Sequence, residues 1–121
     1  MPGIARFEDI QAWQEARELT RRVYEVTATG NLSRDFALRD QIRRAAVATM
    51  SSIAEGFDCD ARADFARFLG VARRKIVELQ SLLYVALDAG HLDQEAFAAY
   101  YAQAAKAKGL IGGFKSSLEK R

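Results

Sequence analysis

The chain has 121 residues, a length that fits one domain with a substantial hydrophobic core. Hydrophobic residues make up 50% of the sequence and charged residues 28%, as in an ordinary water-soluble globular protein. The 18 basic residues nearly balance the 16 acidic ones, which excludes a protein that acts as a polycation throughout. Any binding to nucleic acid must therefore use local patches of positive charge.

The N-terminal segment and the cysteine content indicate a cytoplasmic protein. Residues 1–10 lack the apolar run of a signal peptide, and no segment reaches the roughly 18 apolar residues that a membrane-spanning helix needs. The single cysteine, Cys59, excludes an intramolecular disulfide and an all-cysteine metal site. We expect one cytoplasmic domain over residues 1–121.

Hydrophobic residues recur at intervals of three and four in four segments of the chain. This periodicity predicts amphipathic helices over about 8–28, 35–57, 61–89 and 93–118. The pattern is most regular in the third segment, where it predicts a buried seam formed by Phe65, Leu69, Ala72, Ile76, Leu79, Leu83 and Ala86. Because the connections are short, neighbouring helices must run antiparallel. The predicted fold is all-α, an up-and-down four-helix bundle.

Turn and capping residues separate these segments. Residues 29–32 are interpreted as a connection, followed by Ser33 or Asp35 as the cap of the second helix. Asp60 and Asp93 are the expected caps of the third and fourth helices.

The positions of the glycines lead to three further predictions. Gly56 lies near the end of the second helix, where a positive φ angle is cheapest for glycine, and Gly90 is expected to end the third helix. Gly109, Gly112 and Gly113 interrupt the fourth pattern, and each costs about 1 kcal/mol relative to alanine inside a helix. Either the fourth helix is locally weak there, or these glycines admit a close neighbour.

Residues 40–57 concentrate small side chains on one helix, which predicts the central packing seam of the bundle. Arg43 and Arg44 lie toward one end of this stretch and Glu55 toward the other. Glu55 falls on a row of small residues, so we expect a partly buried carboxylate that pairs with an arginine or caps a neighbouring helix. A catalytic carboxylate is the less favoured alternative, since no second acid or histidine stands nearby in the sequence.

The sequence shows no motif for catalysis or metal binding. His91 is the single histidine, and it lacks the His-x-x-x-His or Glu-x-x-His spacing that helical bundles use for metals. Cys59 lies between two acidic residues, which disfavour a reactive thiolate. Gly112 and Gly113 lack a following Lys-Ser/Thr pair at the spacing of a phosphate loop, and they lie inside a predicted helix. We therefore expect a non-enzymatic protein with no catalytic residue, no metal and no cofactor.

Arginines outnumber lysines strongly before the fourth helix. Arginine suits phosphate recognition as well as buried or interface ion pairs, so a salt-bridged surface, a phosphate-binding surface and a subunit interface all remain open. The candidate nucleic-acid-binding residues are Arg17, Arg21, Arg67, Arg73 and Arg74. Aromatic residues at helical spacing favour core or interface packing over base stacking. They are Trp13, Phe65, Phe68, Tyr100 and Tyr101.

Three segments of the chain resemble a known protein family. They are FEDIQAWQEARELTRRVY, LRDQIRRAAVATMSSIAEGF and DFARFLGVARRKIVELQSLLYVALDAGHL, which together cover roughly residues 7–92. The runs QIRRAA and IAEGF are the most specific. The chain resembles the four-helix-bundle proteins first noticed as products of intervening sequences in bacterial 23S ribosomal RNA. That family includes the accessory variability determinant of diversity-generating retroelements.

The resemblance implies a ring-like homopentamer of four-helix protomers. In the retroelement members a basic surface binds nucleic acid and the reverse transcriptase, so RNA or a reverse transcriptase is the implied partner. This sequence departs from the family pattern in three places. Ser52 stands where many members have asparagine, and Arg74 and Lys75 replace a Gly-Ser pair. Residues 58–60 are Asp-Cys-Asp where the family has a basic loop, which removes positive charge from one end.

Two functions follow as hypotheses. The first is a homo-oligomer whose arginine-bearing faces bind RNA or a nucleic-acid-processing partner. The alternative is a structural or adaptor oligomer that binds protein. Under the resemblance, Arg43, Arg44 and Glu55 become a structural ion-pair or oligomer signature, with Glu55 pairing within or between protomers.

Overall fold

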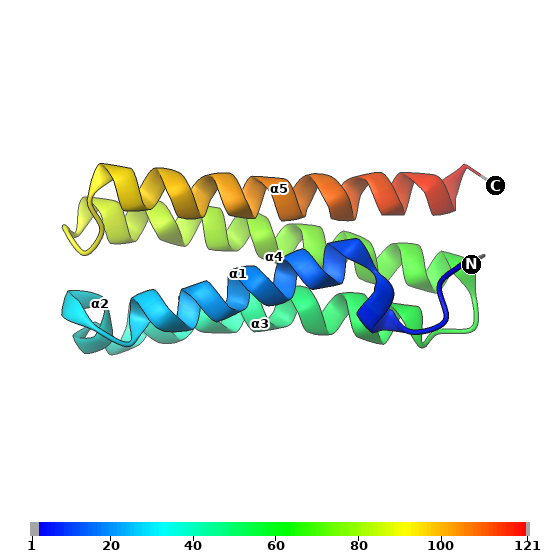
Figure 1. Cartoon of the computed structure of the whole chain (residues 1–121), viewed down its shortest axis with the longest axis horizontal. Helices are drawn as coiled ribbons and strands as arrows, with labels where there is room; N and C mark the ends of the chain where they lie inside the picture. The colour runs from blue at the N-terminus through cyan, green and yellow to red at the C-terminus, as the bar shows by residue number, and fades with distance from the viewer. Residues whose placement is uncertain (1–2, 121) are drawn as a thin grey trace.

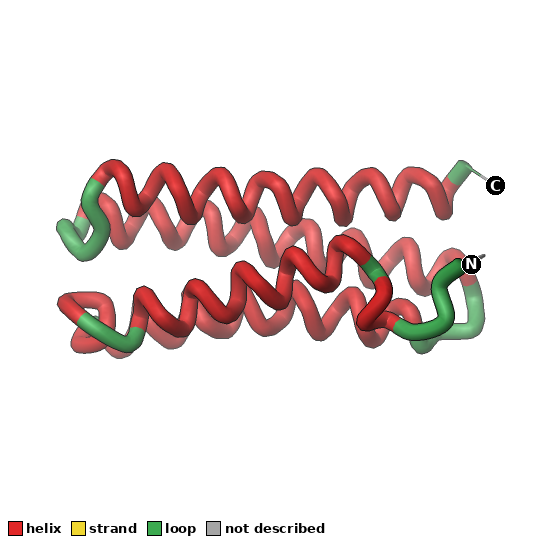
Figure 2. The backbone as a smooth tube through the Cα atoms, in the orientation of Figure 1, coloured by secondary structure: helices red, strands yellow, loops and turns green. Residues whose placement is uncertain are grey.

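Four long helices run antiparallel to their neighbours along the sequence (Figure 1). The computed structural model describes residues 3–120. The long helices are α1 (Gln11–Thr27), α3 (Phe36–Phe57), α4 (Arg62–Asp88) and α5 (Gln94–Glu119). A 3-10 helix, η1 (Phe7–Asp9), precedes α1, and a five-residue helix, α2 (Gly30–Arg34), precedes α3. The prediction of an all-α four-helix bundle is confirmed, and Figure 2 shows how little of the chain lies in loops.

The helices close into a ring in cross-section. Helix α3 packs against α1 and α4, and α5 packs against α4 and α1. Helix α1 therefore lies diagonally across the bundle from α4. Figure 1 shows both ends of the drawn chain at the same end of the bundle. Within residues 3–120, no helix is long and apolar enough to cross a membrane.

The predicted seam of α4 is buried along its whole length. Its seven residues, from Phe65 to Ala86, are at most 5% exposed. In α1 the three-and-four pattern buries Trp13, Leu19 and Val23 against the same core. Removing one such leucine or valine side chain from water contributes about 1.5–3 kcal/mol, so the amphipathic pattern itself drives the helices together.

Helices α3 and α4 pack closely at Gly56. A Cβ atom at this position would lie 2.6 Å from Cβ of Phe68 and 3.0 Å from Cδ1 of Phe65. Gly56 is helical rather than at positive φ, so the expectation of a left-handed cap is wrong. The glycine is instead required by close packing, which agrees with the predicted seam of small residues.

Two of the predicted helix caps are present. Asp35 accepts a hydrogen bond from the backbone N–H of Leu38 at 3.3 Å, which settles the choice between Ser33 and Asp35 at the start of α3. Asp93 accepts from the backbone N–H of Ala96 at 2.8 Å and so caps α5.

The remaining turns differ in part from the prediction. Asp60 does not cap α4, because the extended residue before the helix is Ala61, one position later, and Ala61 has no side-chain acceptor. The connection after α1 is not a plain loop, since it contains the short helix α2 (Gly30–Arg34). Gly90 follows α4 with a φ of 77°, as its predicted role at the helix end requires.

Helix α5 continues without a break through its three glycines. A Cβ atom at Gly109 or Gly113 would meet nothing within 4 Å, and one at Gly112 would meet only the Arg73 side chain, 3.7 Å from its Nε. These glycines therefore do not break the helix and do not admit a tightly packed backbone. They leave an open strip on the surface of α5.

Candidate nucleic-acid interface

The arginines of α1 are balanced by glutamates on the same helix, which carries three of each. Arg21 pairs with Glu18, and its Nη1 lies 2.8 Å from Oε1 of Glu25. The hydrogen bond from Arg21 lowers the pKa of Glu18. Arg17 is exposed, with its guanidinium carbon 5.7 Å from the centre of the Trp13 ring. The two predicted binding residues of α1 thus lie on a helix that carries equal numbers of arginines and glutamates.

Arg43 connects two helices inside the protomer. Its Nε donates a hydrogen bond to Oγ1 of Thr27 at 2.7 Å, and its guanidinium carbon lies 4.5 Å from the centre of the Tyr24 ring. Arg43 therefore joins α3 to α1, in keeping with a structural role. Arg44 is exposed, and neither Arg43 nor Arg44 has a carboxylate within 4 Å in residues 3–120.

Glu55 is exposed, so the expectation of partial burial is wrong. The buried side of α3 passes through Ser52, Ile53 and Gly56, which turns residue 55 toward solvent. No basic group of residues 3–120 lies within 4 Å of the Glu55 carboxylate, so this part of the protomer offers it no ion pair. A pair with another subunit stays a prediction.

The arginines of α4 make fewer close ion pairs with carboxylates. Arg67, Arg73 and Arg74 are all exposed. Nη2 of Arg67 lies 3.9 Å from Oδ1 of Asp64, a distance at the limit of an ion pair. Arg73 and Arg74 have no carboxylate within 4 Å anywhere in residues 3–120. Arg17 of α1 also has no carboxylate within 4 Å in these residues, but α4 carries two such arginines next to each other, Arg73 and Arg74.

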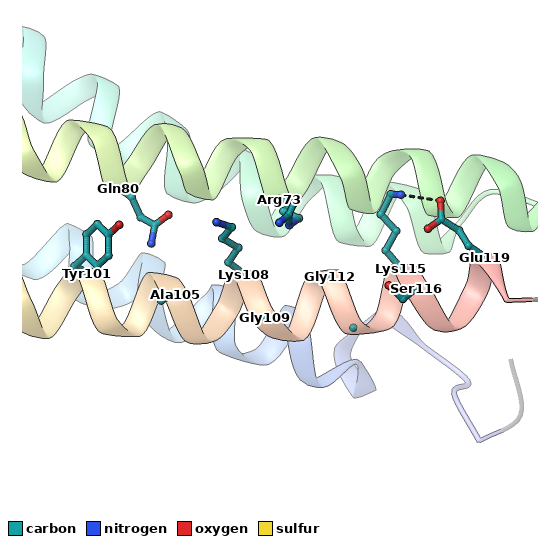
Figure 3. A pocket seen from close by; sticks show the side chains of 11 residues that line it. Arg73, Gln80, Tyr101, Ala105, Lys108, Gly109, Gly112, Lys115, Ser116 and Glu119 are labelled. Atoms are coloured by element: carbon teal, nitrogen blue, oxygen red, sulfur yellow. Dashed lines mark hydrogen bonds and ion pairs between the residues drawn. The ribbon is translucent and has the colours of Figure 1, made fainter.

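An open groove of about 690 Å³ runs between α4 and α5 (Figure 3). Arg73 and Gln80 line it from α4, and Tyr101, Lys108 and Lys115 line it from α5. The strip of α5 glycines forms part of its wall, because no side chain rises there to fill the space.

The groove is positively charged. Three basic residues line it, and Glu119 is the single carboxylate among its described lining residues. Lys115 Nζ lies 2.7 Å from Oε2 of Glu119, whereas Lys108 has no carboxylate within 4 Å in the described chain. A neighbouring hollow of about 520 Å³ shares Lys115 and Glu119 with the groove and adds Arg62 and Arg67. Five basic side chains and one acidic side chain thus line a continuous path along α4 and α5.

The structure divides the predicted residues into two groups. Arg67 and Arg73 lie along this path, with Arg74 exposed beside it on α4. Arg17 and Arg21 lie on α1, which packs against α5 but lies diagonally across the bundle from α4. The residues that sequence reasoning missed are Lys108, Lys115 and Gln80. The seven-residue spacing of Tyr101, Lys108 and Lys115, next to the flagged glycines, was the available signal.

Other polar groups are not arranged for metal chemistry. In residues 3–120, no three side chains of the His, Cys, Asp and Glu types are grouped so as to hold a metal ion. His91 Nε2 lies 3.0 Å from Oδ2 of Asp35, where it joins the α4–α5 turn to the start of α3. Cys59 is half-buried, with its Sγ 3.5 Å from the backbone oxygen of Glu55.

The family model of the 23S rRNA-intervening sequence protein matches residues 8–113. The chain belongs to this family. A crystal structure of a protein of unknown function from the S23 ribosomal protein family of Bacteroides thetaiotaomicron VPI-5482 superposes on this 23S rRNA-intervening sequence family member with a TM-score of 0.78. The match covers 86% of this chain and 97% of that chain at 19% identity, so it shows a shared fold alone. No curated protein matches the sequence.

Proposed function

We propose that this family member is a non-enzymatic homo-oligomer that binds RNA through one basic face. This basic face consists of Arg62, Arg67, Arg73, Arg74, Lys108 and Lys115 on α4 and α5. The alternative ligand of this face is a nucleic-acid-processing protein, such as a reverse transcriptase. The observation that carries the proposal is the charge imbalance of this face, compared with the balanced charges of α1.

Positive groups without carboxylate neighbours attract phosphate most strongly, because no internal ion pair has to be broken first. Arg73, Arg74 and Lys108 meet that condition within residues 3–120. In a closed homo-oligomer, such as the pentamer that the family resemblance implies, each face is repeated around the ring. Copies of a weak site then act at a high effective concentration on one RNA molecule.

RNA titrations at several salt concentrations test the proposal. Log affinity should fall linearly with log salt, by a slope set by the number of phosphate contacts. The double substitution Arg73→Gln/Arg74→Gln should weaken binding and reduce that slope. The matched control, Arg17→Gln/Arg21→Gln, should leave the RNA affinity and the salt slope unchanged. The proposal is wrong if the wild-type protein does not bind RNA at low salt, or if both pairs of substitutions have equal effects.

A second function, that of a protein-binding adaptor, is favoured by exposed apolar side chains on α4. Val77, Tyr84 and Val85 are 46%, 49% and 49% exposed. Such residues are typical of protein interfaces. If the adaptor function is correct, Val77→Asp/Val85→Asp should dissociate the assembly in light scattering, and the wild type should not bind RNA at low salt.

A further inference from the structure

The basic residues of the α4–α5 groove are spread along its length. Lys108 and Lys115 are seven residues apart on α5, which places them on the same side of the helix and about 10.5 Å apart along its axis. Arg73 reaches across from α4 to Gly112, where a Cβ atom would lie 3.7 Å from its Nε. Gly112 falls between the two lysines, so a positive group occurs about every 5 Å along the groove. One row of phosphates fits such a line.

Gln80 is a buried polar residue that lines this groove. The residue as a whole is 8% exposed, but its amide is open to the groove, since His91 Nδ1 is the single fully buried side-chain polar atom without a hydrogen-bond partner in residues 3–120. Because no hydrogen bond to another side chain of the described residues occupies this amide, it is available to bind a group that enters the groove. The amide presents one donor and one acceptor together, which is the pattern needed for the edge of a base. Figure 3 shows Gln80 between Tyr101 and Lys108.

An aromatic cluster stands at the same end of the groove. The rings of Tyr84 and Tyr101 are centred 5.7 Å apart, and both contact Phe97, at 4.7 and 5.5 Å. Phe97 is buried and holds the two tyrosines in place, while Tyr84 remains 49% exposed. Proteins that bind single-stranded nucleic acids stack the bases on aromatic side chains beside a positively charged groove, and the tyrosines have this arrangement.

We infer that the α4–α5 groove binds a single strand of RNA. The strand lies along α5 with its phosphates on Lys108, Arg73 and Lys115, one base on Tyr84 and Tyr101, and a base edge on Gln80. A duplex does not fit this arrangement, because its bases are paired and stacked and cannot reach Gln80 or the tyrosines. The inference rests on the proposed function, since it names the form of RNA that the basic face selects.

Fluorescence anisotropy with a labelled short oligouridylate and a blunt RNA duplex tests the inference. Gly109→Leu places a side chain on the open wall of the groove without changing any charge. Nothing lies within 4 Å of a Cβ atom there, so we expect the fold to persist, as far-UV circular dichroism would verify. Affinity for the oligouridylate should fall by at least about tenfold, the value of one lost base stack. Ala99→Leu, on the exposed side of α5 outside the groove, is the matched control and should have no effect.

Two further variants locate the strand in the groove. Lys108→Gln should lower the slope of log affinity against log salt by about 0.7, the value for one phosphate contact on a single strand. Gln80→Leu should weaken oligouridylate binding several-fold and leave the salt slope unchanged. If Gly109→Leu does not fold, Gln80→Leu tests whether the strand binds in the groove.

The outcomes separate this inference from the proposed function. If Gly109→Leu and Gln80→Leu bind the oligouridylate normally while Arg73→Gln/Arg74→Gln binds it weakly, the groove is not the site, although the basic face still is. If the wild type binds the duplex as tightly as the single strand, the inference is also wrong. If it binds neither RNA at low salt, both the inference and the proposed function are wrong.

Discussion

Two glycines of this bundle differ in the space available for a side chain. At Gly56 there is no space for a side chain, because Cβ of Phe68 on α4 would lie only 2.6 Å from an added methyl group. At Gly113 a methyl group would meet nothing within 4 Å. The same substitution should therefore change stability in opposite directions.

Gly56→Ala should destabilise the protein by about 1–3 kcal/mol, because α3 and α4 must move apart to accept the methyl group. Gly113→Ala, the matched control, should stabilise the protein by about 1 kcal/mol through its higher helix propensity. Urea unfolding followed by circular dichroism measures both changes. If Gly56→Ala is neutral, the packing at this crossing is looser than the structure shows.

Asp35 makes two interactions that favour its charged form. The hydrogen bond with His91 and, to a lesser degree, the backbone N–H of Leu38 lower the pKa of Asp35 below its ordinary value of 3.8. A carboxylate with a lowered folded-state pKa stabilises the protein fully above its ordinary pKa, and this stabilisation is lost as the pH falls through the folded value. The side chain is 37% exposed, so solvent screens part of the effect.

Asp35→Asn should accordingly lower the melting temperature near neutral pH, and the difference from wild type should shrink below about pH 4. Thermal unfolding of both proteins from about pH 6 to about pH 2.5 measures this dependence. Asp88→Asn, at an exposed position of α4, is the control for the loss of one carboxylate. A difference between Asp35→Asn and the wild type that does not change with pH would contradict the role of the His91 pair.

The helix starts show which local features the sequence specifies. Asp35 and Asp93 were both predicted as caps and both accept the expected backbone hydrogen bond. Asp60 carries the same sequence signal but lies one residue too early. A capping residue acts through a single backbone position, so an error of one residue in a predicted boundary removes the interaction.

The effects of alanine substitutions at Asp93 and Asp60 on stability can be compared directly. Asp93→Ala should destabilise the protein by about 1 kcal/mol, because the N–H of Ala96 loses its acceptor at the start of α5. Asp60→Ala should change stability by less than about 0.5 kcal/mol. Urea unfolding measures both. Equal losses would mean that Asp60 caps α4 in solution.

The core of the bundle was predictable, whereas the groove was not. Burial on a long helix repeats every three or four residues, so the α4 seam could be recognised from local pattern alone. The groove depends on Arg73 meeting Gly112, residues that are far apart in the sequence and lie on different helices. The seven-residue spacing of Tyr101, Lys108 and Lys115 puts these residues on one side of α5, but no local pattern specifies that this side faces α4. The prediction for Glu55 was wrong because the buried side of α3 passes through Ser52, Ile53 and Gly56 and not along the row that contains residue 55.

The proposed homo-oligomer also affects the stability of the whole molecule. If folding is coupled to assembly, the melting temperature should rise with total protein concentration, since mass action favours the assembled state. Differential scanning fluorimetry over a wide concentration range, paired with sedimentation velocity, measures this. A melting temperature independent of concentration, together with a monomer mass, would refute the homo-oligomer.

The open strip of glycines also has a consequence for motion. Gly109, Gly112 and Gly113 together forgo roughly 3 kcal/mol of helix propensity relative to alanine. The last third of α5 should therefore open more often than the centre of α4, and its amide hydrogens should exchange faster with solvent. A ligand lying across the strip would slow that exchange. Hydrogen–deuterium exchange would then report occupancy of the groove directly, even for a strand that binds too weakly to be isolated with the protein.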